Sequence, residues 1–269
     1  MDQLKTALAG NRWIIDIQLH LIRQKMAERL NYPASEKTST TFLASSIYKP
    51  SGIDSAISPS KCKPLEILSD NSFCAEYLRL QILHLFNSGS LVKNETLILT
   101  AENWIKEFII TCTSNPNYVL LPKFLEYAIL LENVNFRGAS HPHFLGSLFL
   151  HLRTDDTKFD FFTSIIHESA HHELFLINFV DRLVNKNSDY NLIHAPYQNK
   201  ARPPIGRLHS LHALFRMIQF NLDIAIESSK LTFFISKFKS NLISFEKGEL
   251  TELGNYLLEE VYGPFSKSL

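Results

Sequence analysis

The sequence Ile165-Ile166-His167-Glu168-Ser169-Ala170-His171 lies in the middle of a long apolar run that extends from residue 157 to residue 184. Apolar residues recur along this run at the three- and four-residue spacing of a helix, and the run stops in the polar sequence Asn-Lys-Asn-Ser-Asp. We therefore predict a central helix over about residues 157–184. Asp155 and Asp156 precede it and are candidates for capping its first turn.

His167, Glu168 and His171 form an H-E-x-x-H motif within this predicted helix. Two residues four positions apart lie on the same side of a helix, so the two imidazoles can converge on one metal ion. Glu168 then lies beside that metal. The motif predicts a metal site, but it selects neither the metal nor the reaction.

Helical spacing of apolar residues also appears on both sides of the central run. It predicts further helices at residues 12–30, 72–87, 100–112, 118–131 and 206–220, and two more between 231 and 262. Gly and Pro interrupt the apolar residues of segment 133–153, which predicts one or two short strands leading into the central helix. Segment 33–60 is rich in Ser, Thr and Pro and is predicted to be a long loop.

These elements predict a mainly α fold: a single helical domain over residues 1–269, with a small β element preceding the metal-binding helix. The metal-site core is expected within residues 133–220. A chain of 269 residues with 45% hydrophobic content is long enough to bury such a core.

The composition restricts the partners. Lys plus Arg and Asp plus Glu number 27 each, so net charge gives no attraction to nucleic acid or to an anionic membrane. The three cysteines form no C-x-x-C pair, which argues against a disulfide framework and a thiolate zinc site and favours a reducing, cytoplasmic setting. Neither a signal peptide nor an apolar run long enough to span a membrane is recognisable.

An open metal site needs a third protein ligand from an element that packs against the first helix. His209 and His212 begin the second strongly apolar helical run and are the best candidates, with His209 preferred and only one required. A carboxylate ligand as in gluzincin peptidases would have to come from Glu227 or, less plausibly, from Glu246 or a later glutamate.

The metzincin extension of the motif is absent, because Leu174 and Ile177 stand where that pattern requires Gly and His. The loop before the second helix contains Arg202-Pro203-Pro204. Two prolines stiffen the backbone after Arg202, and a fixed guanidinium near the metal can hold a carboxylate in a bidentate pair.

The H-E-x-x-H motif, followed by Arg202-Pro203 and then by Gly206-Arg207-Leu208-His209 at the start of an apolar helix, resembles the HExxH-motif peptide-modification proteins. These are 2-oxoglutarate-dependent HExxH-type peptide β-hydroxylases. The resemblance covers about residues 133–220, and its Arg-Pro to Gly-x-Leu-His half is the discriminating one. The family usually has Gly after the last histidine, where this chain has Ser210.

The resemblance implies a non-haem Fe(II) dioxygenase that uses 2-oxoglutarate and O₂ to hydroxylate a β-carbon in a ribosomally synthesised precursor peptide. It implies that His167, His171 and His209 bind iron and that Arg202 pairs with a 2-oxoglutarate carboxylate. Glu168 then lies beside the metal, where it orients water and hydrogen bonds or, less readily, coordinates.

Two alternatives stay open at this point. In a zinc metallopeptidase, Glu168 is the general base that activates zinc-bound water. That reading explains Glu168 directly, but it gives Arg202 no necessary role and lacks a well-placed glutamate ligand. In the other alternative, the histidines hold a structural metal or only pack, in a non-catalytic helical interaction module.

Overall fold

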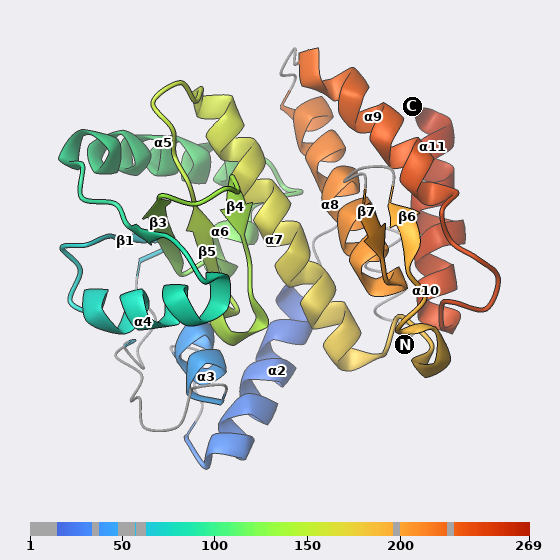
Figure 1. Cartoon of the computed structure of the whole chain (residues 1–269), viewed down its shortest axis with the longest axis horizontal. Coiled ribbons are helices and arrows are strands. Elements are labelled where there is room, and N and C mark those ends of the chain that lie inside the picture. The colour runs from blue at the N-terminus through green and yellow to red at the C-terminus, as the bar shows by residue number, and fades with distance from the viewer. Residues whose placement is uncertain (1–14, 34–37, 48–56, 58–62, 196–199, 225–228) are drawn as a thin grey trace. The chain divides into compact units, whose positions relative to one another are not determined.

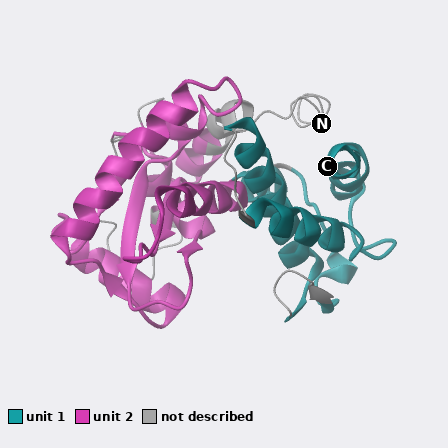
Figure 2. Ribbon diagram, turned by 90° about the horizontal axis from the view of Figure 1, so that it is seen from above, with its two compact units in different colours: residues 1–14, 173–269 teal, residues 15–172 magenta. Residues whose placement is uncertain are grey.

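The computed structural model describes residues 15–33, 38–47, 57, 63–195, 200–224 and 229–269 (Figure 1). The chain divides into two compact units (Figure 2). Unit 2 comprises residues 15–172, and unit 1 comprises residues 1–14 and 173–269. The helix α7 (Lys158–Val180) contributes its first part to unit 2 and its last part to unit 1.

Unit 2 is built on a mixed sheet whose strands are β1 (Glu66–Leu68), β2 (Ser90–Leu91), β3 (Tyr127–Glu132), β4 (Gly138–Ala139) and β5 (Ser147–Leu150). The order is β1-β3-β5-β4, with β2 paired to β3. β3 runs parallel to β1 and β5, whereas β2 and β4 are antiparallel to their partners. The fold is therefore mixed α/β with helices predominating, and its β part is larger than the small element predicted.

β3 corrects the predicted helix at residues 118–131. Only a short turn of helix forms there, α6 (Leu121–Phe124), with Pro122 in its first turn as expected. The following residues, from Tyr127 to Leu131, are all buried in the middle of the sheet. A central parallel strand is buried on both faces, so its apolar run is continuous and cannot be told from a buried helix by periodicity.

Helices cover this sheet. α4 (Ala75–Phe86) confirms the helix predicted at 72–87 and buries Tyr77, Leu78 and Ile82 in one cluster with β3 and β5 residues. α5 (Glu95–Thr113) is longer than the predicted 100–112 and begins at an Asn94 cap, whose side chain accepts hydrogen bonds from two backbone amides. α5 packs on α7 through the Phe108–Phe162 ring pair, at 5.3 Å between centroids.

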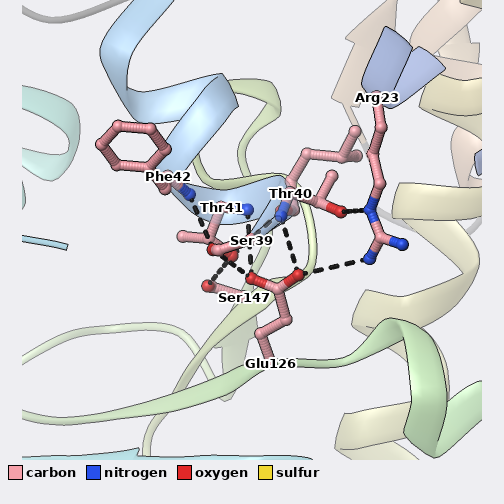
Figure 3. A network of polar contacts seen from close by, with 8 residues as sticks. Arg23, Ser39, Thr40, Thr41, Phe42, Glu126 and Ser147 are labelled. Carbon is pink, nitrogen blue, oxygen red and sulfur yellow. Dashed lines mark hydrogen bonds and ion pairs between the residues drawn. The ribbon is translucent and has the colours of Figure 1, made fainter. Parts of the chain in front are cut away.

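The predicted loop 33–60 contains a helix, α3 (Thr40–Ile47), while residues 34–37, 48–56 and 58–62 lie outside the described residues. Its start is fixed by the buried carboxylate of Glu126 (Figure 3). That carboxylate accepts hydrogen bonds from the Ser39 hydroxyl at 2.5 Å and from the Thr40 and Thr41 amides. Arg23 of α2 (Ile15–Leu30) lies 3.5 Å from it. The Ser39 hydroxyl accepts from the Phe42 amide at 3.0 Å, so the distant Glu126 carboxylate satisfies the two first-turn amides that this cap leaves open.

The strands predicted within 133–153 are β4 and β5, separated by the short 3₁₀ turn η1 (Pro142–Phe144). α7 follows and confirms the central helix. Its cap is Thr157, not Asp155 or Asp156: the Thr157 hydroxyl accepts from the Asp160 amide, and the Asp160 carboxylate accepts from the Thr157 amide. This reciprocal pair is a capping box with Asp in place of Glu.

Unit 1 contains the hairpin β6 (Ile193–Ala195) and β7 (Lys200–Arg202), followed by α8 (Pro204–Asp223) and α9 (Ser229–Leu242). The C-terminal part comprises α10 (Glu252–Tyr256), the π-helical stretch η3 (Leu257–Tyr262) and α11 (Gly263–Ser268). The short 3₁₀ turn η2 (Lys186–Ser188) follows α7. These elements confirm the helix predicted from 206 and the helical character of 231–262.

The core of unit 1 holds a buried ionic network. The Glu173 carboxylate accepts hydrogen bonds from Arg216 Nη2 at 2.6 Å and Nε at 2.7 Å, and it lies 2.8 Å from His212 Nε2. His212 Nδ1 is 2.7 Å from the Tyr262 hydroxyl. Burial alone would raise the pKa of Glu173, but Arg216 and His212 lower that pKa to about 2. Among the described residues, no helix combines the length and the apolarity that a membrane span requires.

Candidate metal centre

His167 and His171 converge as the motif predicts. Their Nε2 atoms are 3.0 Å apart, and the two rings are nearly perpendicular, with 4.7 Å between centroids. Two nitrogens bound at about 2.1 Å to one metal are about 3.0 Å apart when the angle at the metal is about 90°, and about 3.4 Å apart at the tetrahedral angle. The two nitrogens therefore lie close enough together to bind one metal ion.

The protonation state of His167 suits a metal as well. Burial lowers the pKa of His167 to about 4, so its imidazole is neutral near pH 7. A neutral imidazole is the form that coordinates a cation. In the absence of a metal, the 3.0 Å contact between the His167 and His171 rings is a hydrogen bond whose direction depends on the tautomers.

Glu168 lies beside the pair. Its Oε1 is 3.7 Å from His167 Nε2, and one donor atom from each of His167, Glu168 and His171 lies within 4.8 Å of the others. The residue is only 3% exposed. Burial raises the pKa of Glu168 to about 8, although a hydrogen bond from Ser140 acts in the opposite direction. The metal-free carboxyl is therefore mostly protonated at neutral pH, and a bound cation would favour its charged form.

His172 follows His171 and anchors α7 to the sheet. Its Nε2 is 2.8 Å from the Ser147 carbonyl of β5, and its ring lies 5.8 Å from that of Phe124. The Ser147 hydroxyl is 2.8 Å from that of Thr41. Through these contacts the sheet fixes the rotation of α7 and hence the direction of the His167–His171 pair.

The predicted third ligand belongs to unit 1. His209 is half-buried on α8, and its ring lies 4.7 Å from that of Phe175 in the last part of α7. His212 is fully engaged in the network with Glu173 and Tyr262, because both of its ring nitrogens have partners. Both ring nitrogens of His212 are therefore already engaged, and the assignment of His209 as the third ligand remains a prediction.

Arg202 ends the strand β7 and is half-buried. Pro203 has the extended backbone of an N-cap residue, with φ −65° and ψ 160°, and Pro204 begins α8, so the two prolines connect β7 directly to α8. The Arg202 side chain lies against Gly206, where an added Cβ would be 3.6 Å from its Cδ. Its role towards 2-oxoglutarate remains a prediction.

Of the two glutamates named as alternative ligands, the structure describes only Glu246. Glu227 lies outside the described residues. The amide of Glu246 donates a 2.9 Å hydrogen bond to the Glu249 carboxylate, which also pairs with the buried Arg207 at 2.6 Å. Glu246 therefore lies in a turn of unit 1 that the Arg207–Glu249 ion pair stabilises.

Two residues near the site were not identified from the sequence as functional. Gly138 and Ser140 belong to β4 and the residue after it, and both contact the Glu168 side chain. In the sequence, Gly138 is only one of the glycines and prolines that interrupt an apolar segment. Their proximity to Glu168 depends on the pairing of β4 with β5, which no local sequence pattern predicts.

Comparison with known proteins gives no relative to supplement this geometry: no protein-family model matches the chain, and no curated protein matches it significantly. The proposed function therefore rests on the sequence motifs of this chain and on the arrangement of its site residues.

Proposed function

We propose that this protein is an Fe(II)- and 2-oxoglutarate-dependent dioxygenase that hydroxylates a β-carbon of a residue in a ribosomally synthesised precursor peptide. The observation that supports it best is the 3.0 Å separation of the His167 and His171 Nε2 atoms, with Glu168 beside them. The choice of iron and 2-oxoglutarate follows the resemblance carried by Arg202-Pro203 and Gly206-Arg207-Leu208-His209.

In this proposal His167, His171 and His209 hold the metal. Fe(II), when bound, supplies O₂ activation, so that 2-oxoglutarate, O₂ and a peptide C–H group become succinate, CO₂ and a peptide C–OH group. Three protein ligands would leave coordination positions open for 2-oxoglutarate and O₂. The reducing, cytoplasmic setting predicted from the cysteines would keep the iron as Fe(II).

Arg202 is assigned to the carboxylate of 2-oxoglutarate that does not contact the metal. Its guanidinium is permanently charged and follows a strand that ends at two prolines. A charge-assisted hydrogen bond contributes about 1.5–3 kcal/mol, so loss of this contact should weaken 2-oxoglutarate binding by roughly 10- to 100-fold.

A zinc metallopeptidase is the second candidate, and the position of Glu168 favours it. A carboxyl group next to the metal-binding pair is where a general base for metal-bound water is needed. Such a base must be ionised, whereas burial holds the pKa of the metal-free Glu168 near 8. The bound metal would have to supply that ionisation.

Metal and cosubstrate assays separate the two candidates. The dioxygenase should bind Fe(II) and form succinate from 2-oxoglutarate under O₂, and His167→Ala and His171→Ala should abolish both. His84→Ala, at an exposed histidine of α4, is the matched control and should change neither.

Two further variants distinguish the roles of individual residues. Arg202→Ala should raise the 2-oxoglutarate concentration required while leaving Fe(II) affinity unchanged, and Arg29→Ala, an exposed arginine of α2, should have no effect. Cleavage of peptides by the Zn(II)-loaded protein, with no succinate from the Fe(II)-loaded protein, would instead identify the peptidase.

A further inference from the structure

Strand β4 and the residue that follows it lie against the Glu168 side chain. At Gly138, the three atoms nearest to an added Cβ all belong to Glu168: Cγ and Oε1 at 2.8 Å and Cδ at 3.1 Å. Real Cβ atoms do not approach other atoms so closely, so the present position of Glu168 requires that residue 138 has no side chain.

The backbone of Gly138 does not explain the glycine. Among the described glycines, positive φ angles occur at Gly89, Gly146 and Gly248, and Gly138 is not one of them. Alanine could therefore adopt the same backbone conformation without strain. The closest approaches to a Cβ at residue 138 therefore come from the Glu168 side chain.

Ser140 supplies the polar half of the same contact. Its hydroxyl donates a hydrogen bond to the Glu168 carboxyl, which is otherwise almost wholly removed from water. A buried carboxyl that lost this partner would have to find another one or reorient. Gly138 and Ser140 thus restrict Glu168 in two independent ways, by shape and by hydrogen bonding.

We propose that Gly138 and Ser140 form a seat that holds the Glu168 carboxyl beside the His167–His171 pair, and that Ser140 is a positioning residue acting through Glu168. The proposal rests on the metal site of the proposed function. In the seat, Oε1 is 3.7 Å from His167 Nε2. The seat therefore keeps the carboxyl next to the position where His167 and His171 would hold a metal ion.

The first test uses Co(II), whose visible absorption reports its coordination, as a probe of metal affinity. Ser140→Ala should weaken Co(II) binding by about 10-fold or more, as loss of partners around a metal site does, and should alter the spectrum. Ser140→Thr keeps the hydroxyl and should restore both. Ser90→Ala is the matched control, because the Ser90 hydroxyl contacts Glu132 in the same sheet, at 3.4 Å.

The decisive comparison repeats these measurements in a Glu168→Ala background. If Ser140 acts through Glu168, Ser140→Ala should cause no further loss of Co(II) affinity there. An equal loss in both backgrounds, or no loss in the wild type, would overturn the assignment of Ser140.

A metal-free test separates the seat from the proposed function. Gly138→Ala should lower the urea midpoint of unfolding in the wild type, because Glu168 must leave its position. In the Glu168→Ala background the same substitution should leave the midpoint unchanged or raise it, since alanine then reduces only the entropy of the unfolded chain. A chain that shows this coupling and binds no metal would retain the seat and contradict the proposed function, whereas equal shifts in both backgrounds would overturn the seat.

Discussion

Replacing Glu168 with Gln in the metal-free protein should remove a large part of the pH dependence of stability. Burial raises the pKa of Glu168 from 4.5 to about 8, so the folded state keeps a proton that the unfolded state releases above about pH 4.5. The stability associated with this proton is fully present below the unfolded pKa and is lost as pH rises through the folded pKa. Gln has nearly the same shape and does not titrate.

The structure gives the size of this effect. One pKa unit corresponds to about 1.4 kcal/mol, so raising the pH from about 5 to about 8 should cost the wild type roughly 3–4 kcal/mol relative to Glu168→Gln, as an order of magnitude. His167, with its pKa lowered to about 4, titrates in the opposite sense. Subtracting the variant from the wild type removes that contribution.

The assay is urea unfolding across this pH range with a chelator present, because a bound cation would favour the charged carboxylate. Glu259→Gln, at an exposed position of η3, is the control and should follow the wild type. A difference between wild type and Glu168→Gln that stays constant with pH would refute the argument that the carboxyl is buried and neutral.

Three further predictions concern the framework of the site, and urea unfolding measures each. Arg216→Met should destabilise the protein by about 3–5 kcal/mol because it removes the arginine that neutralises the buried Glu173 charge and leaves only the His212 contact. Adding Glu173→Gln should recover part of this loss, and additive losses would contradict the explanation. Gly146→Ala should lower the free energy of unfolding more than Gly248→Ala does. Both glycines have φ near +90°, but only at Gly146 would an added Cβ meet a backbone oxygen, at 3.2 Å. Equal losses of stability in the two variants would contradict this explanation. Glu126→Gln should cost roughly 1–3 kcal/mol because it weakens the cap of α3, and an unchanged midpoint would show that the cap contributes nothing.

The helices that position the site could be predicted because they are long and periodic. α7 and α8 follow from repeated apolar spacing over five or more turns, and the convergence of His167 and His171 follows from their four-residue separation alone. These are local properties of the chain.

The sheet could not be predicted in the same way. β1 and β2 have three and two residues, too few to show an alternation, and β3 was mistaken for helix because its residues are buried on both faces. The contacts of Gly138 and Ser140 with Glu168 depend on which strand pairs with β5, a long-range property. The half of the site that surrounds Glu168 was therefore not recognisable from the sequence.

The most direct test of the proposed function is anaerobic addition of 2-oxoglutarate to the Fe(II)-loaded protein, followed by visible absorption. We predict a charge-transfer band that is lost in His167→Ala and His171→Ala, is kept in His84→Ala, and requires more 2-oxoglutarate in Arg202→Ala. Absence of the band in a wild-type protein that binds Fe(II), or absence of Fe(II) binding itself, would contradict the assignment of this chain as a 2-oxoglutarate-dependent dioxygenase.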